Sequence, residues 1–243
     1  MTEVVVTGLG VVGPWGAGKA ATREAIERGS IPRSIVGRSA GFHRRGGATL
    51  AGLCRDADLA GLLPPAQARR MSQPSKLAVA ATTLALREAG LAAGGEEFAT
   101  TGVTVSTAFG PSSFTERLLH AIFHLGPDQA SPAVFAESVA SAAASQVALS
   151  TRALGPNLTV TQRESGALQA IGDAAAWVRR GRAERMLAGS VEEMTPLLHA
   201  VLDRFGALAT GDEICRPFDA ERHVVFESGR YVFETAELVG YEA

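Results

Sequence analysis

One stretch of the chain decides the fold: it runs from Gly155 to Ala175 and reads GPNLTVTQRESGALQAIGDAA. Residues 158–161 are apolar or β-branched, which predicts a short buried strand. Between Ser165 and Arg179 the apolar side chains recur on one stripe, which predicts a helix. A strand that turns sharply into a helix lifts one side chain to the helix N-terminus, where the helix dipole stabilises a thiolate or an oxyanion. At this elbow the sequence places Glu164.

The rest of the chain continues the same alternation of strand and helix. Gly and Pro separate the apolar segments from one another. The period of the hydrophobic residues alternates between two, as in strands, and 3.6, as in helices. Strands are predicted at 4–6, 103–105, 158–161, 185–189 and 231–238, with a short extra one at 34–36; helices are predicted at 19–27, 75–89, 114–123, 140–149 and 165–179. This order predicts an α/β protein with parallel-sheet character. We expect a single domain over residues 1–243, built as three α-β-α layers around a mostly parallel, five-stranded sheet.

Composition excludes several classes of protein. Hydrophobic residues make up 46% of the chain and charged residues 20%, which is enough apolar material for a packed core. The net charge of −2 argues against a non-specific nucleic-acid binder. No apolar run approaches the about 18 residues that a membrane span needs, and no signal peptide is visible at the N-terminus. The only cysteines, Cys54 and Cys215, lack metal-binding spacing, so we expect a cytoplasmic protein with neither a metal site nor a cofactor.

One segment has the glycine spacing of a dinucleotide-binding motif but lacks its other features. The segment from Gly8 to Gly13 reads GLGVVG after a short apolar strand. In a nucleotide-binding fold a helix begins within this motif, and an acidic residue follows about 20 residues later. Here Pro14-Trp15-Gly16 interrupts the helix, and Gly37-Arg38 follows the next possible strand. We therefore interpret the glycines as a tight turn after the first strand.

The elbow resembles the nucleophile elbow of the β-ketoacyl synthases, the thiolase-fold condensing enzymes of fatty-acid and polyketide synthesis. Alignment from Gly155-Pro156-Asn157 or from Ile171-Gly172 places Glu164 at the position of the family's nucleophilic cysteine. Further segments resemble the family in the same order along the chain: Val4–Pro14, Arg69–Met71, Ser131-Pro132 with Ala142–Ala144, Met186–Gly189 and Arg216–Asp219. The resemblance implies the first half of a thiolase-like fold.

Two departures from the family pattern bear on activity. A carboxylate at Glu164 cannot replace the thiolate that accepts an acyl chain, and neither Cys54 nor Cys215 follows a strand-to-helix turn. Glu164 is interpreted as a helix-capping carboxylate, with decarboxylation or proton transfer as alternatives. The family's fold is duplicated, with its active-site histidines in the second half, and we expect this chain, ending at Ala243, to contain only the first half. None of the five histidines stands where a family histidine should: His43, His120, His124, His199 and His223.

Other features fit a protein without condensing activity. The family's glycine-rich turn after the Arg216–Asp219 loop is replaced by bulky residues in Arg222–Arg230, which a flexing gate would tolerate poorly. His120 and His124 share a helical face, as a metal-binding pair can, but without a third ligand motif a surface or interface pair is favoured. A half fold should also expose an apolar face that a partner, self-association or a local rearrangement must cover.

The resemblance is nearest to a chain length factor, the non-catalytic homologue that pairs with a ketosynthase in type II polyketide systems. It implies a full-length β-ketoacyl synthase as partner, contact with acyl carrier protein through the complex, and no nucleic-acid or membrane partner. The alternatives are a malonyl-carrier-protein decarboxylase that uses Glu164 and a self-associating scaffold.

The resemblance also implies which residues meet the partner near its acyl tunnel. Phe109 and Phe135 are large enough to block a tunnel, although both could instead be ordinary core residues. The full candidate set is Phe109, Ser112, Ser113, Glu116, Ala133 and Phe135.

Overall fold

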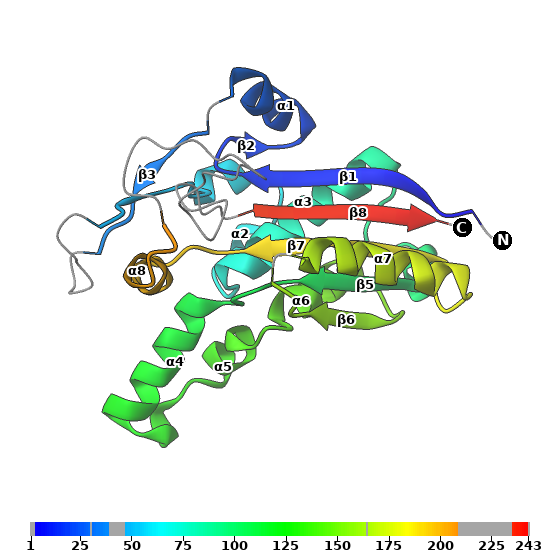
Figure 1. Ribbon diagram of the computed structural model, residues 1–243. Coiled ribbons are helices and arrows are strands. Elements are labelled where there is room, and N and C mark those ends of the chain that lie inside the picture. Colours follow the sequence, from blue (N-terminus) through cyan, green and yellow to red (C-terminus); the bar gives the residue numbers. More distant parts are fainter. Residues whose placement is uncertain (1–2, 30, 39–46, 164, 209–234, 243) are drawn as a thin grey trace.

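The structure is a computed structural model, and it describes residues 3–29, 31–38, 47–163, 165–208 and 235–242 (Figure 1). The strands are β1 (Val5–Gly13), β2 (Gly16–Ala17), β3 (Ser34–Ile35), β4 (Leu50–Ala51), β5 (Thr101–Ser106), β6 (Asn157–Val160), β7 (Arg185–Glu192) and β8 (Thr235–Glu242). The helices are α1 (Lys19–Arg28), α2 (Pro65–Ala68), α3 (Gln73–Ala89), α4 (Ser112–Leu125), α5 (Pro132–Ser138), α6 (Ala142–Thr151), α7 (Gly166–Arg179) and α8 (Pro196–Arg204). Single 3₁₀ turns lie at Asp56–Leu59, Glu96–Ala99 and Pro127–Gln129.

The main sheet contains six described strands in the order β2-β1-β8-β7-β5-β6, so the predicted number of five is wrong by one. The additional strand, β2, is only two residues long and folds back antiparallel on the end of β1. β5 runs parallel to β6 and β7, whereas β8 runs antiparallel to both β7 and β1. Because β1 therefore runs in the same direction as β7, four of the six strands share one direction.

Helices cover both faces of this sheet, which confirms the predicted three α-β-α layers (Figure 1). On one face α3 and α6 pack on the odd-numbered residues of the central strands, among them Val103, Val105 and Leu187. On the other face α7 packs on Met186 and Ala188 of β7. The alternation of side chains along β5 and β7 separates these two cores.

The central helix α3 has the boundaries that its sequence favours. The Ser72 side chain accepts a hydrogen bond from the N–H of Ser75, Pro74 stands in the first turn, and Gly90 ends the helix with a left-handed φ of 71°. Leu77, Ala81 and Ala85, which recur on one face of the helix, are all buried.

The glycines of the first strand do not form the turn that we predicted. β1 continues through Gly8 and Gly10 to Gly13, and a Cβ added at Gly8 or Gly10 would overlap the carbonyl oxygen of Ala85 or Ala81 in α3. These two glycines let strand and helix backbones approach closely. The motif therefore serves packing between layers.

A small second unit joins the hairpin β3–β4 to α8. Arg38 pairs with Asp203 at 3.2 Å, and the N–H of Ala48 donates to Asp203 at 2.9 Å. Both charged side chains are buried. His199 of α8, also fully buried, bonds the carbonyl oxygen of Leu50 at 3.2 Å.

Several boundaries differ from the sequence prediction. The last described strand, β8, extends to Glu242, past the predicted end at residue 238, and residues 231–234 of that prediction lie outside the described residues. Helices α5 and α8 had not been predicted. Among the described helices, none is by itself long and apolar enough to cross a membrane; α5 and α6 reach the required length and composition only together, across a bend of 102°.

Candidate functional site

The elbow lies at the carboxyl end of the parallel strands. β6 ends at Val160, whose carbonyl oxygen accepts the N–H of Thr107 at 3.0 Å, and α7 begins at Gly166. A Cβ on Gly166 would overlap the hydroxyl of Ser106, so the first turn of α7 stands directly against the end of β5. Glu164 itself lies outside the described residues, and its capping role stays a prediction.

The β5–α4 connection reaches this same edge of the sheet and carries three of the candidate residues. Phe109 is 38% exposed. Ser112 and Ser113, which begin α4, are partly buried and donate to Glu193. The structure thus brings these three residues together beside the end of β7.

The other three candidates lie apart from the sheet, on an arm formed by α4 and α5 that extends beyond it (Figure 1). Glu116 is partly buried in α4, and Ala133 and Phe135 are exposed on α5. At 59% exposure Phe135 is not a core residue of this chain, and neither is Phe109. Burial within the chain therefore gives no support to the alternative in which both are ordinary core.

A buried carboxylate holds the arm in place. Glu137 at the end of α5 accepts the N–H of Ser72 at 2.7 Å, the hydroxyl of Ser75 at 2.8 Å and the side-chain amide of Gln146 at 2.6 Å. These bonds connect α5 with the start of α3 and with α6. The base of the arm is therefore fixed even though its far end projects.

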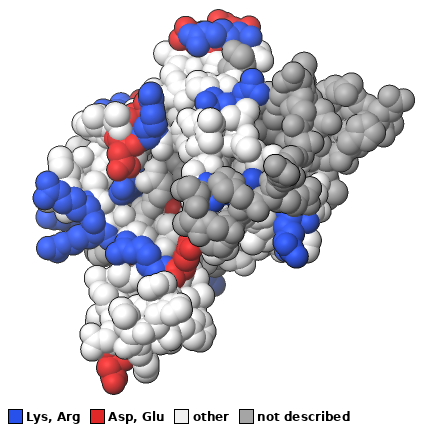
Figure 2. All heavy atoms as spheres, turned by 90° about the vertical axis from the view of Figure 1, so that its left-hand side faces the viewer, with Lys and Arg blue, Asp and Glu red and all other residues white. Residues whose placement is uncertain are grey.

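The surface of the arm is largely apolar. At the bottom of Figure 2 it presents mainly uncharged atoms, and between α4 and α5 lies a hollow of about 430 Å³ lined in part by Leu118, Leu125 and Val134. Large apolar side chains stay exposed on it: Leu119, Phe123, Leu125, Phe135 and Val139. Exposed apolar patches of this kind mark interaction surfaces.

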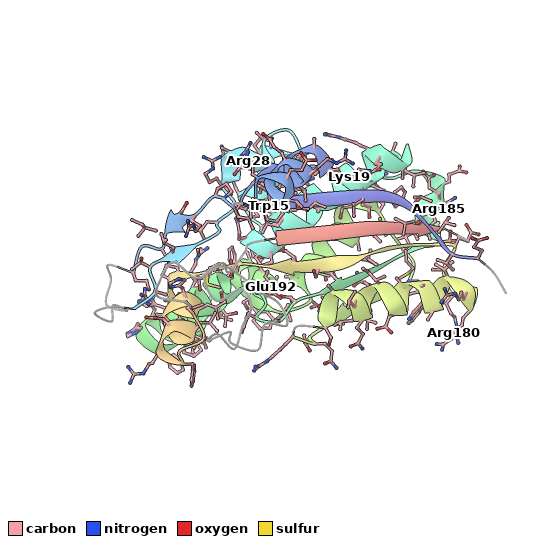
Figure 3. All side chains as sticks on the ribbon, turned by 45° about the horizontal axis from the view of Figure 1, so that its top comes forward. Trp15, Lys19, Arg28, Arg180, Arg185 and Glu192 are labelled. Carbon is pink, nitrogen blue, oxygen red and sulfur yellow. The ribbon has the colours of Figure 1, made fainter. Side chains whose placement is uncertain are left out.

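Two consecutive acidic residues at the end of β7, Glu192 and Glu193, are part of the site although they were not predicted (Figure 3 labels Glu192). Glu192 accepts the N–H groups of Ala108 and Phe109. Burial raises the pKa of Glu192 to about 7, against the opposing effect of these N–H groups. Burial likewise raises the pKa of Glu193. Two acidic residues directly after a predicted parallel strand were the sequence signal that could have revealed them.

The thiols and histidines form no second centre in the described part of the chain. Cys54 is buried near the 3₁₀ turn at Asp56–Leu59, and Cys215 lies outside the described residues. The rings of His120 and His124 stack with centroids 4.5 Å apart on the exposed side of α4. No described group of three His, Cys, Asp or Glu side chains is arranged to hold a metal ion.

Comparisons with known proteins agree with this geometry. The family model described as "Beta-ketoacyl synthase, N-terminal domain" matches residues 1–229. The 3-oxoacyl-[acyl-carrier-protein] synthase 2 of Vibrio harveyi is 29% identical over 226 residues, which cover 90% of this chain and 54% of that protein. The chain thus spans about half the length of this relative.

Two solved structures are similar over almost the entire chain. A β-ketoacyl synthase from Burkholderia phymatum has a TM-score of 0.83 and 26% identity, covering 100% of this chain and 59% of its own. A type II polyketide synthase acyl-carrier protein in complex with its ketosynthase, bound to the hexaketide, gives a TM-score of 0.79 at 25% identity and covers 99% and 58%.

Proposed function

Because this chain belongs to the β-ketoacyl synthase family and has its thiolase-like fold, we propose that it is a non-catalytic, chain-length-factor-like partner of a full-length β-ketoacyl synthase. It would act in the cytoplasm, in type II polyketide or fatty-acid-like biosynthesis, where it completes the complex and shapes the acyl tunnel. The observation that carries this proposal is Glu164 at the elbow, the position of the family's nucleophile. A carboxylate there cannot form the acyl thioester on which condensation depends.

The edge of the sheet beside the arm supports the choice of partner. β6 is the last strand of the sheet, so the outer side of its backbone has no neighbouring strand among the described residues. Leu154 before it is 78% exposed, and Leu158 within it is 36% exposed. An unpaired edge strand beside an apolar arm fits a second sheet-bearing subunit. In the similar polyketide complex, a ketosynthase holds its acyl-carrier protein, and we propose that the carrier reaches this chain through such a partner.

The α7 face of the sheet supports the same conclusion. Leu168 on the outer side of α7 is 75% exposed. Beyond α7, Leu9 and Val11 of β1 and Ile26 of α1 line an open groove of about 400 Å³. Covering this apolar surface would stabilise the protein, because each square ångström removed from water contributes about 25 cal/mol.

Co-expression with a full-length ketosynthase, followed by affinity capture and size-exclusion chromatography, tests the proposal. We expect a stable complex that Phe135→Asp in the arm disrupts. The matched control is Ile35→Asp on β3, outside the arm, the β6 edge and the α7 face, with 75% exposure. Failure to capture any ketosynthase, or equal loss with both variants, would contradict the proposal.

The two alternatives predict other results in the same preparation. A self-associating scaffold would elute as a homo-oligomer whether or not a ketosynthase is present. A malonyl-carrier-protein decarboxylase would release CO₂ from malonyl carrier protein, and Glu164→Gln would abolish that release.

A further inference from the structure

Two carboxyl groups hold the connection between β5 and α4 together with the first turn of α4. Glu192 accepts the N–H of Ala108 and, at 3.3 Å, that of Phe109. Glu193 accepts the N–H of Ser113 at 2.7 Å and the hydroxyls of Ser112 and Ser113, both at 3.1 Å. Two consecutive side chains of one strand end thus hold a loop that lies 80 or more residues earlier in the chain.

The loop itself is a tight turn. The N–H of Gly110 donates to the Thr107 hydroxyl at 3.0 Å, and Gly110 has a left-handed φ of 66°. Glu192 holds the N–H of Phe109, whose side chain is 38% exposed. Because hydrogen bonds fix the loop on both sides, the partly exposed Phe109 ring is held in a defined position. Such a ring can contact a molecule outside this chain.

Holding the loop in this way is energetically costly. Within the described residues, neither Glu192 nor Glu193 forms an ion pair, although the charge of Lys76 favours the ionised form of Glu193. Glu193 is 2% exposed. Burying carboxylates without a cation is expensive, and groups arranged in this way gather at functional sites.

We propose that Glu192 is a positioning residue for Phe109: it fixes the β5–α4 connection at the carboxyl edge of the sheet and so determines where the phenylalanine stands in the acyl path of the complex. Glu193 holds the first turn of α4, where it accepts the N–H of Ser113. Glu192 is the residue that accepts the N–H of Phe109 itself. The role in acyl-chain specificity rests on the proposed function, whereas the positioning of the loop does not.

This arrangement should respond to pH. The groups that face Glu192 are Glu193 beside it, the Thr107 hydroxyl, and the N–H groups of Ala108 and Phe109. Since the closed loop raises the pKa of Glu192 to about 7, the closed form holds its proton to a higher pH than an open, hydrated form would. By linkage, raising the pH through about 7 therefore favours opening.

Hydrogen exchange of residues 107–110 in the full chain, corrected for intrinsic rates and measured from pH 6 to pH 8.5, is the direct test. In the wild type we expect exchange to accelerate as the pH rises. Glu192→Gln mimics the protonated acid and should stay slow at every pH. Glu192→Ala removes both acceptors and should exchange at least about tenfold faster throughout. Glu184→Ala, at the other end of β7, is the matched control and should leave this segment unchanged.

Product analysis in the ketosynthase complex provides the second readout. If Glu192 positions Phe109, Glu192→Ala shifts the product ladder in the same direction as Phe109→Ala, by whole two-carbon units. Unchanged exchange in Glu192→Ala would overturn the inference, and so would faster exchange with an unshifted ladder in a complex where Phe109→Ala does shift it. If no ketosynthase complex forms, the proposed function fails, while the exchange measurement still decides whether Glu192 positions the loop.

Discussion

Single residues decide the chemistry at the carboxyl edge of the sheet. By resemblance Glu164 aligns with the family's nucleophile. Glu192 and Glu193 at the end of β7 accept backbone N–H groups of the β5–α4 connection and of α4. Acyl transfer needs a thiolate and hydrogen-bond donors that stabilise an oxyanion, whereas these carboxyl groups act as hydrogen-bond acceptors.

The two exposed phenylalanines, Phe109 and Phe135, should influence the length of the products. Phe109→Ala or Phe135→Ala, in complex with a ketosynthase, should shift carrier-bound products by whole two-carbon units. Because both rings are exposed in the chain, at 38% and 59%, the loss of stability should be well below the about 3–5 kcal/mol of a buried phenylalanine. Mass spectrometry of the intermediates and thermal melts measure the two effects. An unchanged ladder from a well-folded mutant complex would remove that residue from the gate.

A buried histidine predicts the acid sensitivity of the chain. The carbonyl oxygen of Leu50 can only accept, so Nε2 of His199 donates to it, and Nδ1 has no hydrogen-bond partner among the described residues. Burial lowers the pKa of His199, and Arg38 nearby lowers it further. Below about pH 6.5, His199 is therefore protonated more readily in the unfolded chain than in the folded chain. The free energy of unfolding should fall as the pH drops through this value.

His199→Gln is the variant that isolates this effect. Glutamine retains an N–H donor for Leu50 and cannot be protonated, so urea melts from pH 8 to pH 5 should show a shallower loss of stability than in the wild type. Identical slopes for the two proteins would show that His199 does not cause the acid sensitivity.

Elements were predicted well where local chemistry determines them. Helices α1, α3, α4, α6 and α7 and strands β5, β6 and β7 were found within a few residues, because caps, glycine stops and hydrophobic periods are local signals. The signal for α8 was also present, since Thr195 accepts the N–H of Leu198 at 3.1 Å and Pro196 follows it. That helix could have been predicted and was missed.

Features that depend on distant parts of the chain could not be read from the sequence. The glycines of β1 were interpreted as a turn because the sequence around them gives no sign of α3. That helix, which requires the glycines because it packs closely on β1, lies about 70 residues further along the chain. The hydrogen bonds of Glu192 and Glu193 likewise reach a loop that is remote in sequence. The resemblance placed Glu164 at the elbow, yet no local pattern indicated which groups would surround it.

Two glycine substitutions test the packing of these elements. Gly10→Ala forces a Cβ against the Ala81 carbonyl in α3, and we expect it to cost about 1–3 kcal/mol or more. The matched control is Gly172→Ala in the middle of α7, where a Cβ meets nothing within 4 Å. That change should stabilise the chain by up to about 1 kcal/mol, because alanine favours helix over glycine. Equal effects in chemical denaturation would contradict the close packing of β1 on α3.

In the molecule as a whole, exposed apolar side chains lie on several separate parts of the described surface. The arm, the β6 edge and the α7 face all carry exposed leucine, valine or phenylalanine side chains. The chain also spans about half the length of its relative from Vibrio harveyi. Exposed apolar surface of this kind is typical of interaction sites.

We propose that this chain contributes to condensation without catalysing it, and a reconstituted assay tests this proposal. Carrier-bound products from malonyl and acetyl carrier protein are followed by mass spectrometry with the pure chain, with a partner ketosynthase, and with both. We predict no product from the chain alone and longer or more uniform products from the complex than from the ketosynthase alone. Condensation by the chain alone that persists through further purification, or a complex whose products match those of the ketosynthase alone, would contradict the claim.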